Sequence, residues 1–367
     1  MKKIIHIQVV PQLSGVQQVS LDILKGLGPD FDKYILFGGR SEDDSFNKNF
    51  EEYGIKVIYV ESLARNISLK DIKAFWDLYV FFKINDFDIV HTNSTKPGIL
   101  ARVAAKLAGI KQVYHTVHGI AFHQHEPRLK RFFYYSLEII SSLFGDLNIT
   151  VNKYYLKYYP RLFCKSQAVY NGVDFSKLTV QKRNSSDCIN IGFFARLDQQ
   201  KDPLTFIHIV NHLLENKMLH HKVHFYLAGD GELREQCLDL IKRLNLNKTI
   251  TYVGWVSNKS DFFNGIDILC QPSLWEAFGL NLAEAGYFSI PCVASNVEGI
   301  PEVVLHDKTG ILCPAQNVKL FSEAIAKLVN DAEYRALLSA QAAKNVKVNF
   351  QQSTMVKHYK ELYLNNE

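Results

Sequence analysis

Short β-branched runs alternate with helical patterns along almost the whole chain, and this alternation limits the possible folds most strongly. The first half contains seven runs that we expect to be strands, at 4–10, 34–37, 56–60, 89–92, 113–117, 147–151 and 168–170. The second half contains six more, at 189–194, 223–228, 250–253, 268–270, 292–294 and 311–313. Strands that alternate with helices in this way form a parallel sheet that helices cover on both faces. The sequence therefore predicts an α/β fold with two parallel sheets.

A polar stretch at 181–187, Gln-Lys-Arg-Asn-Ser-Ser-Asp, separates the two series of strands. The length of 367 residues suits two domains of ordinary size. We therefore expect two Rossmann-like domains, at 1–180 and 181–350, followed by a helical segment at 351–367.

The composition argues against several classes of protein. Hydrophobic residues make up 47% of the chain and charged residues 22%, without a biased tract, as in soluble globular proteins. The longest apolar runs are far shorter than the roughly 20 residues that a membrane-spanning helix needs. The six cysteines are scattered without a C-x-x-C pair, which favours reduced thiols in a cytosolic protein over a disulfide framework or a zinc site.

The net charge of +5 is concentrated in residues 127–165, where seven basic residues stand against two acidic ones. The basic residues are Arg128, Lys130, Arg131, Lys153, Lys157, Arg161 and Lys165. Pairs of aromatic residues lie between them, as in Phe132-Phe-Tyr-Tyr135. This pattern suits an anionic membrane surface, and it could also suit nucleic acid. It is equally compatible with a solvated helix whose aromatic side chains pack inward.

Two carboxylates, Glu276 and Glu284, lie eight residues apart around a predicted helix start at Phe278-Gly279-Leu280. The start of a helix offers unpaired backbone N–H groups and the positive end of a dipole, which suits a phosphate group. Carboxylates accept hydrogen bonds from hydroxyl groups. Anion donors flanked by hydroxyl acceptors indicate a pocket for a sugar nucleotide. The alternative is an amphipathic helix with one solvated glutamate.

Arg196 and Lys201 follow the first strand of the second half, at the sheet edge where α/β proteins bind ligands. Two cations there can neutralise a diphosphate, although loop cations at a surface are also common. Gly229 and Gly231 end the next strand and permit close approach of the backbone to a ligand.

The first half has its own candidates. Gly15 and Val16 begin a helix after the first strand and could contact a phosphate, and His118 ends the fifth strand. Four histidines between 115 and 125 suggest a metal, but His115 and His118 should point to opposite faces of the strand, and no carboxylate recurs at ligand spacing. We therefore expect no metal site, and we interpret Asp86-Phe-Asp88 as a solvated loop.

Together these features resemble retaining glycosyltransferases of the GT-B fold, specifically glycosyltransferase family 4. The resemblance is strongest at 189–316, and its motifs are Gly192, Arg196, Lys201, Gly229-Asp-Gly231, Pro272-Ser273, Glu276-Ala-Phe-Gly279, Glu284, Gly299-Ile-Pro-Glu302 and Gly310. The first half adds Gly15-Val-Gln17, His91-Thr-Asn-Ser94, Lys96-Pro-Gly98 and His118-Gly119. The run at 115–123 is similar to members that build bacterial surface polysaccharides.

The resemblance implies an acceptor domain first and a nucleotide-sugar domain second, facing each other across a cleft. A C-terminal helix would cross back to the first domain. By this match Arg196 and Lys201 would hold the donor diphosphate, and Glu284 would accept from the ribose hydroxyls. Glu276 and the backbone at 278–280 would hold the donor sugar and phosphate.

In the first domain, the resemblance implies that His118 faces the sugar and that Gly15 lets the N-terminal loop approach it. The sequence departs from the family pattern at three positions. Ser14 replaces the first glycine of a common pair, Ala277 replaces a common glycine, and Glu298 stands where glycine is frequent. The first departure bears on the geometry of the N-terminal loop.

We therefore expect a retaining glycosyltransferase that moves a hexose or N-acetylhexosamine from a nucleotide-diphosphate sugar, with a UDP-sugar favoured. The expected acceptor is a lipid-linked glycan or oligosaccharide in O-antigen or capsule synthesis. We expect no cofactor, no metal and no nucleic-acid partner, and a cytoplasmic protein that binds the inner face of the plasma membrane through 127–165. The alternatives are a nucleotide-sugar epimerase, a non-catalytic GT-B protein that binds nucleotide or glycan, and a nucleic-acid-binding protein.

Overall fold

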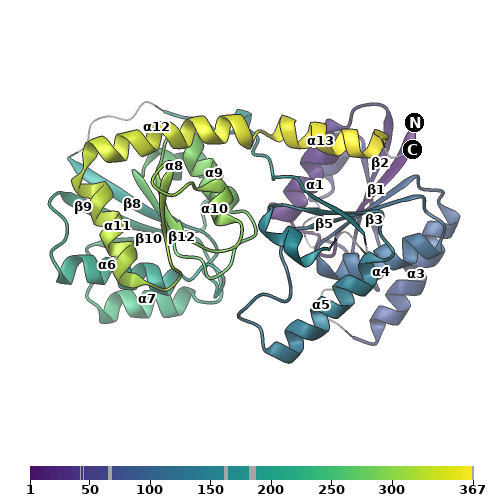
Figure 1. The fold of residues 1–367 in the computed structure, drawn as a ribbon, viewed down its shortest axis with the longest axis horizontal. Helices are drawn as coiled ribbons and strands as arrows, with labels where there is room; N and C mark the ends of the chain where they lie inside the picture. The colour runs from purple at the N-terminus through teal and green to yellow at the C-terminus, as the bar shows by residue number, and fades with distance from the viewer. Residues whose placement is uncertain (42, 44, 65–67, 161–163, 182–186, 366–367) are drawn as a thin grey trace. The chain divides into compact units, whose positions relative to one another are not determined.

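The structure is a computed structural model that describes residues 1–41, 43, 45–64, 68–160, 164–181 and 187–365. The chain divides into two compact units (Figure 1). Unit 1 is Met1–Gly172 with Gln352–Glu367, and unit 2 is Val173–Gln351. The sequence places the same divisions at 180/181 and 350/351. Most of the polar stretch at 181–187 lies outside the described residues.

Unit 1 is built on a seven-stranded sheet in the order β3-β2-β1-β4-β5-β6-β7, and all of its pairings are parallel. The strands are β1 (Lys2–Ile7), β2 (Phe31–Phe37), β3 (Ile55–Tyr59), β4 (Ile89–Asn93), β5 (Gln112–Val117), β6 (Leu147–Thr150) and β7 (Lys165–Ala168). Because both faces are covered, the central strands are almost continuously apolar or buried.

Helices cover the two faces of this sheet. On one face lie α1 (Gly15–Gly26), α2 (Lys48–Glu51) and α13 (Gln352–Asn365), and their apolar side chains share one core with the sheet. On the other lie α3 (Lys70–Ile84) and α4 (Thr95–Leu107), which share a second core. Helix α5 (Arg128–Ser142) packs beside α4 (Figure 1). A 3₁₀ helix at Tyr154–Tyr158 follows β6.

Helix α13 is fixed to the sheet of unit 1 by buried hydroxyl groups. The Tyr363 hydroxyl lies 3.1 Å from His6 Nε2 and also hydrogen-bonds His91 Nδ1. The Tyr359 hydroxyl lies 3.1 Å from Thr116 Oγ1. Both tyrosines are fully buried, so this helix completes the core of unit 1 although it comes last in the chain.

Unit 2 is built on a six-stranded parallel sheet in the order β10-β9-β8-β11-β12-β13. The strands are β8 (Cys188–Phe194), β9 (Lys222–Ala228), β10 (Ile250–Gly254), β11 (Ile268–Gln271), β12 (Cys292–Ser295) and β13 (Gly310–Cys313). The helices are α6 (Pro203–Glu215), α7 (Arg234–Arg243), α8 (Lys259–Asn264), α9 (Leu280–Tyr287), α10 (Ile300–Val303), α11 (Val318–Asn330) and α12 (Ala332–Asn349), with a 3₁₀ helix at Phe175–Lys177.

Alternate side chains of β8 point to the two faces of this sheet, as the strand period requires. Ile191 and Phe193 belong to the core shared with α6, α7 and α11. Phe194 points the other way and stacks on Phe262 of α8, with ring centroids 5.0 Å apart. Because both faces of the strand are packed, the loop that follows β8 leaves the sheet from a rigid base.

The predicted α/β fold with two Rossmann-like sheets is confirmed, and each expected strand is present in the expected order. Strand β7 lies at Lys165–Ala168, whereas the sequence predicts a strand at 168–170. The prediction is displaced because the sequence Lys-Ser-Gln-Ala has no apolar run. An edge strand of this kind needs none, since polar residues protect its open side. Among the described residues, no helix has the length and hydropathy needed to cross a bilayer.

Candidate active site

Most of the predicted donor-binding residues lie where the strands of unit 2 end. Arg196 follows β8, Gly229 follows β9, and Glu276 lies between β11 and α9. These three strands are neighbours in the sheet, in the order β9-β8-β11, and run parallel. Their carboxyl ends therefore meet at one edge, where open α/β sheets bind ligands.

Lys201 and Glu276 form an ion pair between Nζ and Oε2, and both side chains are largely buried. The loops that carry them are joined by their backbones, since the Leu274 N–H donates to the Gln200 carbonyl at 2.8 Å. The Lys201 N–H donates to Asp198 Oδ1 at 3.0 Å, which fixes the turn before α6. The structure thus places the predicted phosphate-binding lysine directly against the predicted sugar-binding glutamate.

Arg196 is much more open than Lys201, with 60% of its side chain exposed. Its Nη2 lies 2.9 Å from Asp198 Oδ2 and 3.3 Å from Gln200 Oε1. The two residues predicted to bind the diphosphate therefore pair with different carboxylates, Arg196 with Asp198 and Lys201 with Glu276. A guanidinium at the surface can reorient toward an anion at little cost, whereas Lys201 has a fixed position.

Glu284 lies on the first turns of α9 with its carboxylate buried. Its Oε1 accepts from Lys259 Nζ at 2.6 Å, but its Oε2 has no hydrogen-bond partner. Burial raises the pKa of Glu284, and the charge of Lys259 opposes this rise. A buried carboxylate oxygen without a donor is costly, so this atom is poised to accept from a ligand hydroxyl.

The start of α9 offers its backbone rather than side chains. Gly279 precedes the helix with a φ of 86°, a left-handed conformation that favours glycine. The Phe278 ring is buried edge-on against Phe350, with centroids 5.3 Å apart. The Leu280 side chain is half-buried. Because the first N–H groups of a helix lack partners within it, the backbone at 278–280 can face an anion.

The glycines after β9 allow two loops of unit 2 to pack closely against each other. A Cβ atom on Gly229 would lie 1.8 Å from the Ala195 carbonyl oxygen, and one on Gly231 would lie 2.5 Å from that of Leu197. The backbone that these glycines approach is therefore the loop that carries Arg196. Contact of Gly229 with a donor stays a prediction, but its packing role positions Arg196.

Three predicted residues belong to unit 1. Gly15 is the exposed first residue of α1, and the half-buried Val16 accepts from Gln8 Nε2 through its carbonyl at 3.4 Å. His118 follows β5, and its Nε2 lies 3.1 Å from Asn93 Oδ1 at the end of β4. Burial lowers the pKa of His118 to about 3, so its imidazole is neutral at physiological pH.

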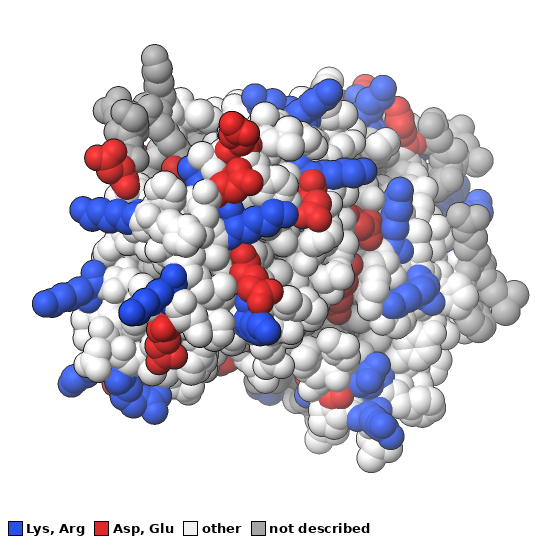
Figure 2. Space-filling model, turned by 60° about the vertical axis from the view of Figure 1, so that its left-hand side comes forward, with Lys and Arg blue, Asp and Glu red and all other residues white. Residues whose placement is uncertain are grey.

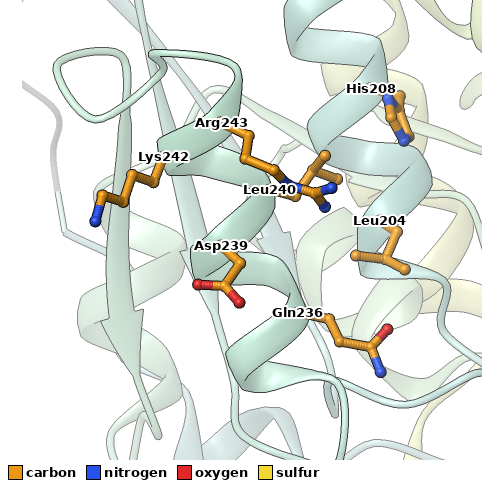
Figure 3. A pocket seen from close by; sticks show the side chains of 7 residues that line it. All are labelled: Leu204, His208, Gln236, Asp239, Leu240, Lys242 and Arg243. Carbon is orange, nitrogen blue, oxygen red and sulfur yellow. The ribbon is translucent and has the colours of Figure 1, made fainter.

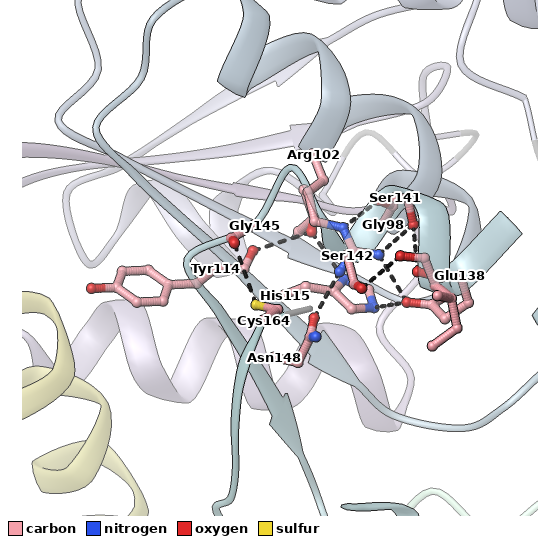
Figure 4. Close-up of polar contacts among 12 residues, drawn as sticks. Gly98, Arg102, Tyr114, His115, Glu138, Ser141, Ser142, Gly145, Asn148 and Cys164 are labelled. Carbon is pink, nitrogen blue, oxygen red and sulfur yellow. Dashed lines mark hydrogen bonds and ion pairs between the residues drawn. The ribbon is translucent and has the colours of Figure 1, made fainter. Parts of the chain in front are cut away.

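His115 lies apart from His118, in a buried polar network around Arg102 (Figure 4). Arg102 Nη2 donates to Glu138 Oε1 at 2.8 Å, and Nη1 donates to Asn148 Oδ1 at 2.7 Å. His115 Nε2 lies 3.6 Å from the same Glu138 oxygen. The described residues contain no group of three or more histidines, cysteines or carboxylates that could hold a metal ion.

Several residues near these sites escaped the sequence prediction. Lys259 has no motif that links it to Glu284, 25 positions later in the chain. For Glu298 the sequence indicates only a departure from glycine. It has a φ of 42°, which explains why glycine suits the position, and its Oε2 accepts the Glu276 N–H at 3.0 Å.

A surface hollow of about 780 Å³ lies between α6 and α7 (Figure 3). Its lining residues are Leu204, His208, Gln236, Asp239, Leu240, Lys242 and Arg243. It contains none of the residues predicted to bind the donor, and its polar side chains project from two helices rather than from strand ends.

Two family models together cover almost all of the chain. The model described as Glycosyltransferase Family 4 matches residues 13–177, and Glycosyl transferases group 1 matches residues 176–345. The UDP-Gal:α-D-GlcNAc-diphosphoundecaprenol α-1,3-galactosyltransferase of Escherichia coli is 31% identical to the chain, with 99% of this chain and 96% of the relative covered.

Solved structures share the fold over the whole length. Sucrose-phosphate synthase from Thermosynechococcus elongatus superposes with a TM-score of 0.85 at 17% identity, covering 100% of this chain and 99% of the other. HepE of Anabaena, in complex with UDP-glucose, has a TM-score of 0.79 at 18% identity, with 99% of each chain covered. The predicted fold and family are confirmed: the chain is a glycosyltransferase and belongs to the GT-B glycosyltransferases of the family 4 type.

Proposed function

We propose that this glycosyltransferase moves a hexose or N-acetylhexosamine from a UDP-sugar to a lipid-linked glycan, with retention of the anomeric configuration. The product would enter a bacterial surface polysaccharide such as an O-antigen or a capsule. The proposal is supported by the Escherichia coli relative, whose name specifies a UDP-Gal donor and a diphosphoundecaprenol-linked acceptor. The HepE complex with UDP-glucose supports the same class of donor.

The unpartnered Oε2 of Glu284 is the observation that carries the donor assignment. This oxygen is buried at the sheet edge of unit 2, beside a helix start that suits phosphate. A ribose hydroxyl would satisfy it while the phosphates face the start of α9. Lys259 would hold the carboxylate in its charged form during binding.

The leaving group is a nucleoside diphosphate, so catalysis requires fixed positive charge near its phosphates. Lys201 is fixed by Glu276, and Arg196 is free to turn from Asp198 toward the diphosphate. Glu276 would accept a hydroxyl of the donor sugar rather than act as a nucleophile, and the neutral His118 would hydrogen-bond the sugar. The proposed reaction requires no metal or cofactor.

The proposed membrane contact rests on the orientation of α5. Its buried residues are polar, namely Glu138, Ser141 and Ser142. Its outer face is apolar and exposed, and comprises Leu129, Phe132, Phe133, Ile140 and Leu143. At about 100° per residue these five positions span roughly 100° of the helix surface. An exposed apolar face on an amphipathic helix is typical of binding at a membrane interface.

The cations of α5 contribute less to this face than the sequence suggested. Lys130 pairs with Glu126 at 2.8 Å, and Arg131 Nε donates to the Phe122 carbonyl at 3.3 Å. Arg128 is exposed at the start of the helix, and Arg161 lies outside the described residues. We therefore propose that apolar insertion leads the contact of α5 with the inner face of the plasma membrane.

Calorimetric binding of UDP to the purified protein tests the donor site. Glu284→Gln should weaken UDP binding by about 10-fold or more, as expected for loss of a charged hydrogen bond worth roughly 1.5–3 kcal/mol. Glu276→Gln should leave UDP binding within a few-fold of wild type and lower transfer from the UDP-sugar. Glu235→Gln is the control, since 82% of that side chain is exposed on α7. Equal UDP affinity in the Glu284→Gln variant and the control would refute the ribose assignment.

A further inference from the structure

Helix α3 is apolar on two opposite faces, and only one of them is covered within unit 1. Ala74, Leu78 and Phe82 are buried in the core between α3, α4 and the sheet. The opposite side exposes a row of large apolar side chains. The row, with the exposed fraction of each residue, comprises Leu69 (89%), Ile72 (64%), Trp76 (56%), Val80 (49%) and Ile84 (73%). A row of large apolar side chains exposed side by side normally marks an interaction surface, so the exposed row indicates a partner.

The exposed row forms a continuous stripe along the helix. Successive members are three or four residues apart, and at about 100° per residue all five fall within an arc of roughly 120°. Lys73 and Lys83 are exposed on the same arc. The carboxylates of α3 lie off it, since Asp71 pairs with Lys96 at 2.7 Å and Asp77 accepts from Ser62 at 2.6 Å. The arc of α3 thus carries cations without carboxylates, whereas basic and acidic side chains are mixed on the face of the molecule that Figure 2 shows.

The stripe on α3 lies in the same helical layer as α5. Helices α3 and α5 flank α4 on one side of the sheet of unit 1 (Figure 1). Both helices thus expose apolar side chains from one layer. They differ in charge, because the cations of α3 are exposed within its stripe, whereas Lys130 and Arg131 of α5 are turned to partners on the protein.

We propose that the outer face of α3, from Leu69 to Ile84, is a second membrane contact of unit 1 and binds an anionic lipid surface. This inference rests on the proposed membrane docking of α5. Lysines within an apolar stripe can extend to anionic headgroups while their stems stay in the apolar layer. Trp76 suits the boundary between headgroups and acyl chains. A second copy of the chain on this face would instead bring like charges, Lys73 and Lys83, into one interface.

Two membrane contacts can fix the orientation of unit 1, which a single contact cannot. A single amphipathic helix attaches unit 1 to the bilayer but leaves it free to rotate about the helix axis. A second helix in the same layer fixes that rotation. Because the acceptor is proposed to be lipid-linked, a fixed orientation would present unit 1 to the acceptor at a constant height above the membrane.

Co-sedimentation of the full chain with vesicles separates the two helices. The α3 variant is Ile72→Gln/Trp76→Gln/Val80→Gln, and the α5 variant is Phe132→Gln/Phe133→Gln. The control is Trp255→Gln, which changes a tryptophan in unit 2 that is more exposed than Trp76. With vesicles of phosphatidylglycerol and phosphatidylcholine, the partition coefficient of the α3 variant should be lower than that of wild type by about 10-fold or more. Three apolar side chains no longer contribute to the interface. The control should partition as wild type, and donor hydrolysis should be unchanged in all three.

A fluorescence measurement checks that α3 itself enters the bilayer. Brominated acyl chains should quench the wild-type tryptophan emission, and Trp76→Phe should remove most of that quenching while Trp255→Phe keeps it. Equal quenching in Trp76→Phe and wild type would overturn the inference. So would an α3 variant that pellets like wild type, or one that only converts a dimer to a monomer in sedimentation analysis.

The outcomes also distinguish this inference from the function on which it rests. If wild type binds neither phosphatidylglycerol vesicles nor phosphatidylcholine vesicles, membrane docking as a whole is refuted. If the α5 variant is released and the α3 variant is not, docking by α5 stands and the role of α3 is refuted. Loss of partitioning in the α3 variant, with an unchanged free energy of unfolding, supports α3 as a contact.

Discussion

Helices α5 and α11 are both strongly two-sided, but they face opposite ways. Helix α11 of unit 2 buries Phe321, Ile325 and Leu328 and turns its charged residues to solvent. Helix α5 of unit 1 buries Glu138 and two serines and turns its apolar residues to solvent. Amphipathicity therefore indicates that a helix has an inner and an outer side, but it does not identify which side is inner. In unit 1 the buried guanidinium of Arg102 pairs with Glu138 and so turns the polar side of α5 inward.

The largest effect should follow from removing the partner of this guanidinium. Glu138→Leu leaves Arg102 buried and without its carboxylate, which typically costs about 3–5 kcal/mol of unfolding free energy. Denaturant titration measures this loss. The double variant Arg102→Met/Glu138→Leu should recover much of it, because no buried charge is left. A single variant within about 1 kcal/mol of wild type would show that α5 does not depend on this pair.

A matched pair of isoleucines tests the opposite orientations directly. Ile325→Ala on α11 removes a fully buried side chain and should cost about 2–5 kcal/mol. Ile140→Ala on α5 removes a side chain that is 56% exposed and should change stability by no more than about 0.5 kcal/mol. Denaturant titration of both variants gives the comparison. Similar costs would mean that α5 is covered in solution.

The two arginines should differ in what their loss affects. Arg102 is fully buried, whereas Arg196 is exposed at the sheet edge of unit 2. Arg196→Ala should therefore lower glycosyl transfer by about 100-fold and leave the unfolding free energy nearly unchanged. Initial rates with a UDP-sugar and a lipid-linked acceptor measure the loss. Arg243→Ala, an exposed arginine on α7, serves as the control, and equal rates in the two variants would remove Arg196 from the mechanism.

The smallest effect is a difference in acid sensitivity. Burial lowers the pKa of His6 from 6.5 to about 3, and it lowers those of His91 and His115 well below 6.5. Between these pH values the unfolded chain binds more protons than the folded one. Each such histidine therefore lowers the unfolding free energy of unit 1 by about 1.4 kcal/mol per pH unit as the pH falls below 6.5.

Unfolding measured at several pH values between 7.5 and 5 tests this sign. Stability should be constant above pH 7 and fall on acidification, and His6→Gln should make the fall less steep, since a glutamine can still bond Tyr363 without titrating. An identical slope in wild type and His6→Gln would show that His6 is not buried in its neutral form.

The strand and helix order of both units could be predicted from the sequence, because buried parallel strands leave local apolar runs. The motif residues Arg196, Lys201, Glu276 and Glu284 could be placed at one sheet edge for the same reason. The inward or outward direction of α5 could not be predicted. It depends on Arg102, which lies 36 residues before Glu138 in the chain and meets it only in the folded unit. Likewise, no local pattern connects Lys259 to Glu284.

Helix α13 has a consequence for the synthesis of the protein. The ribosome completes all of unit 2 before it makes the residues that cover His6 and His91 in unit 1. The unit that is translated first therefore finishes folding last, and one face of its sheet stays only partly covered, by α1 and α2, while the second unit forms. A stop codon placed just after residue 351 would leave unit 2 with its whole sheet and would damage unit 1 instead.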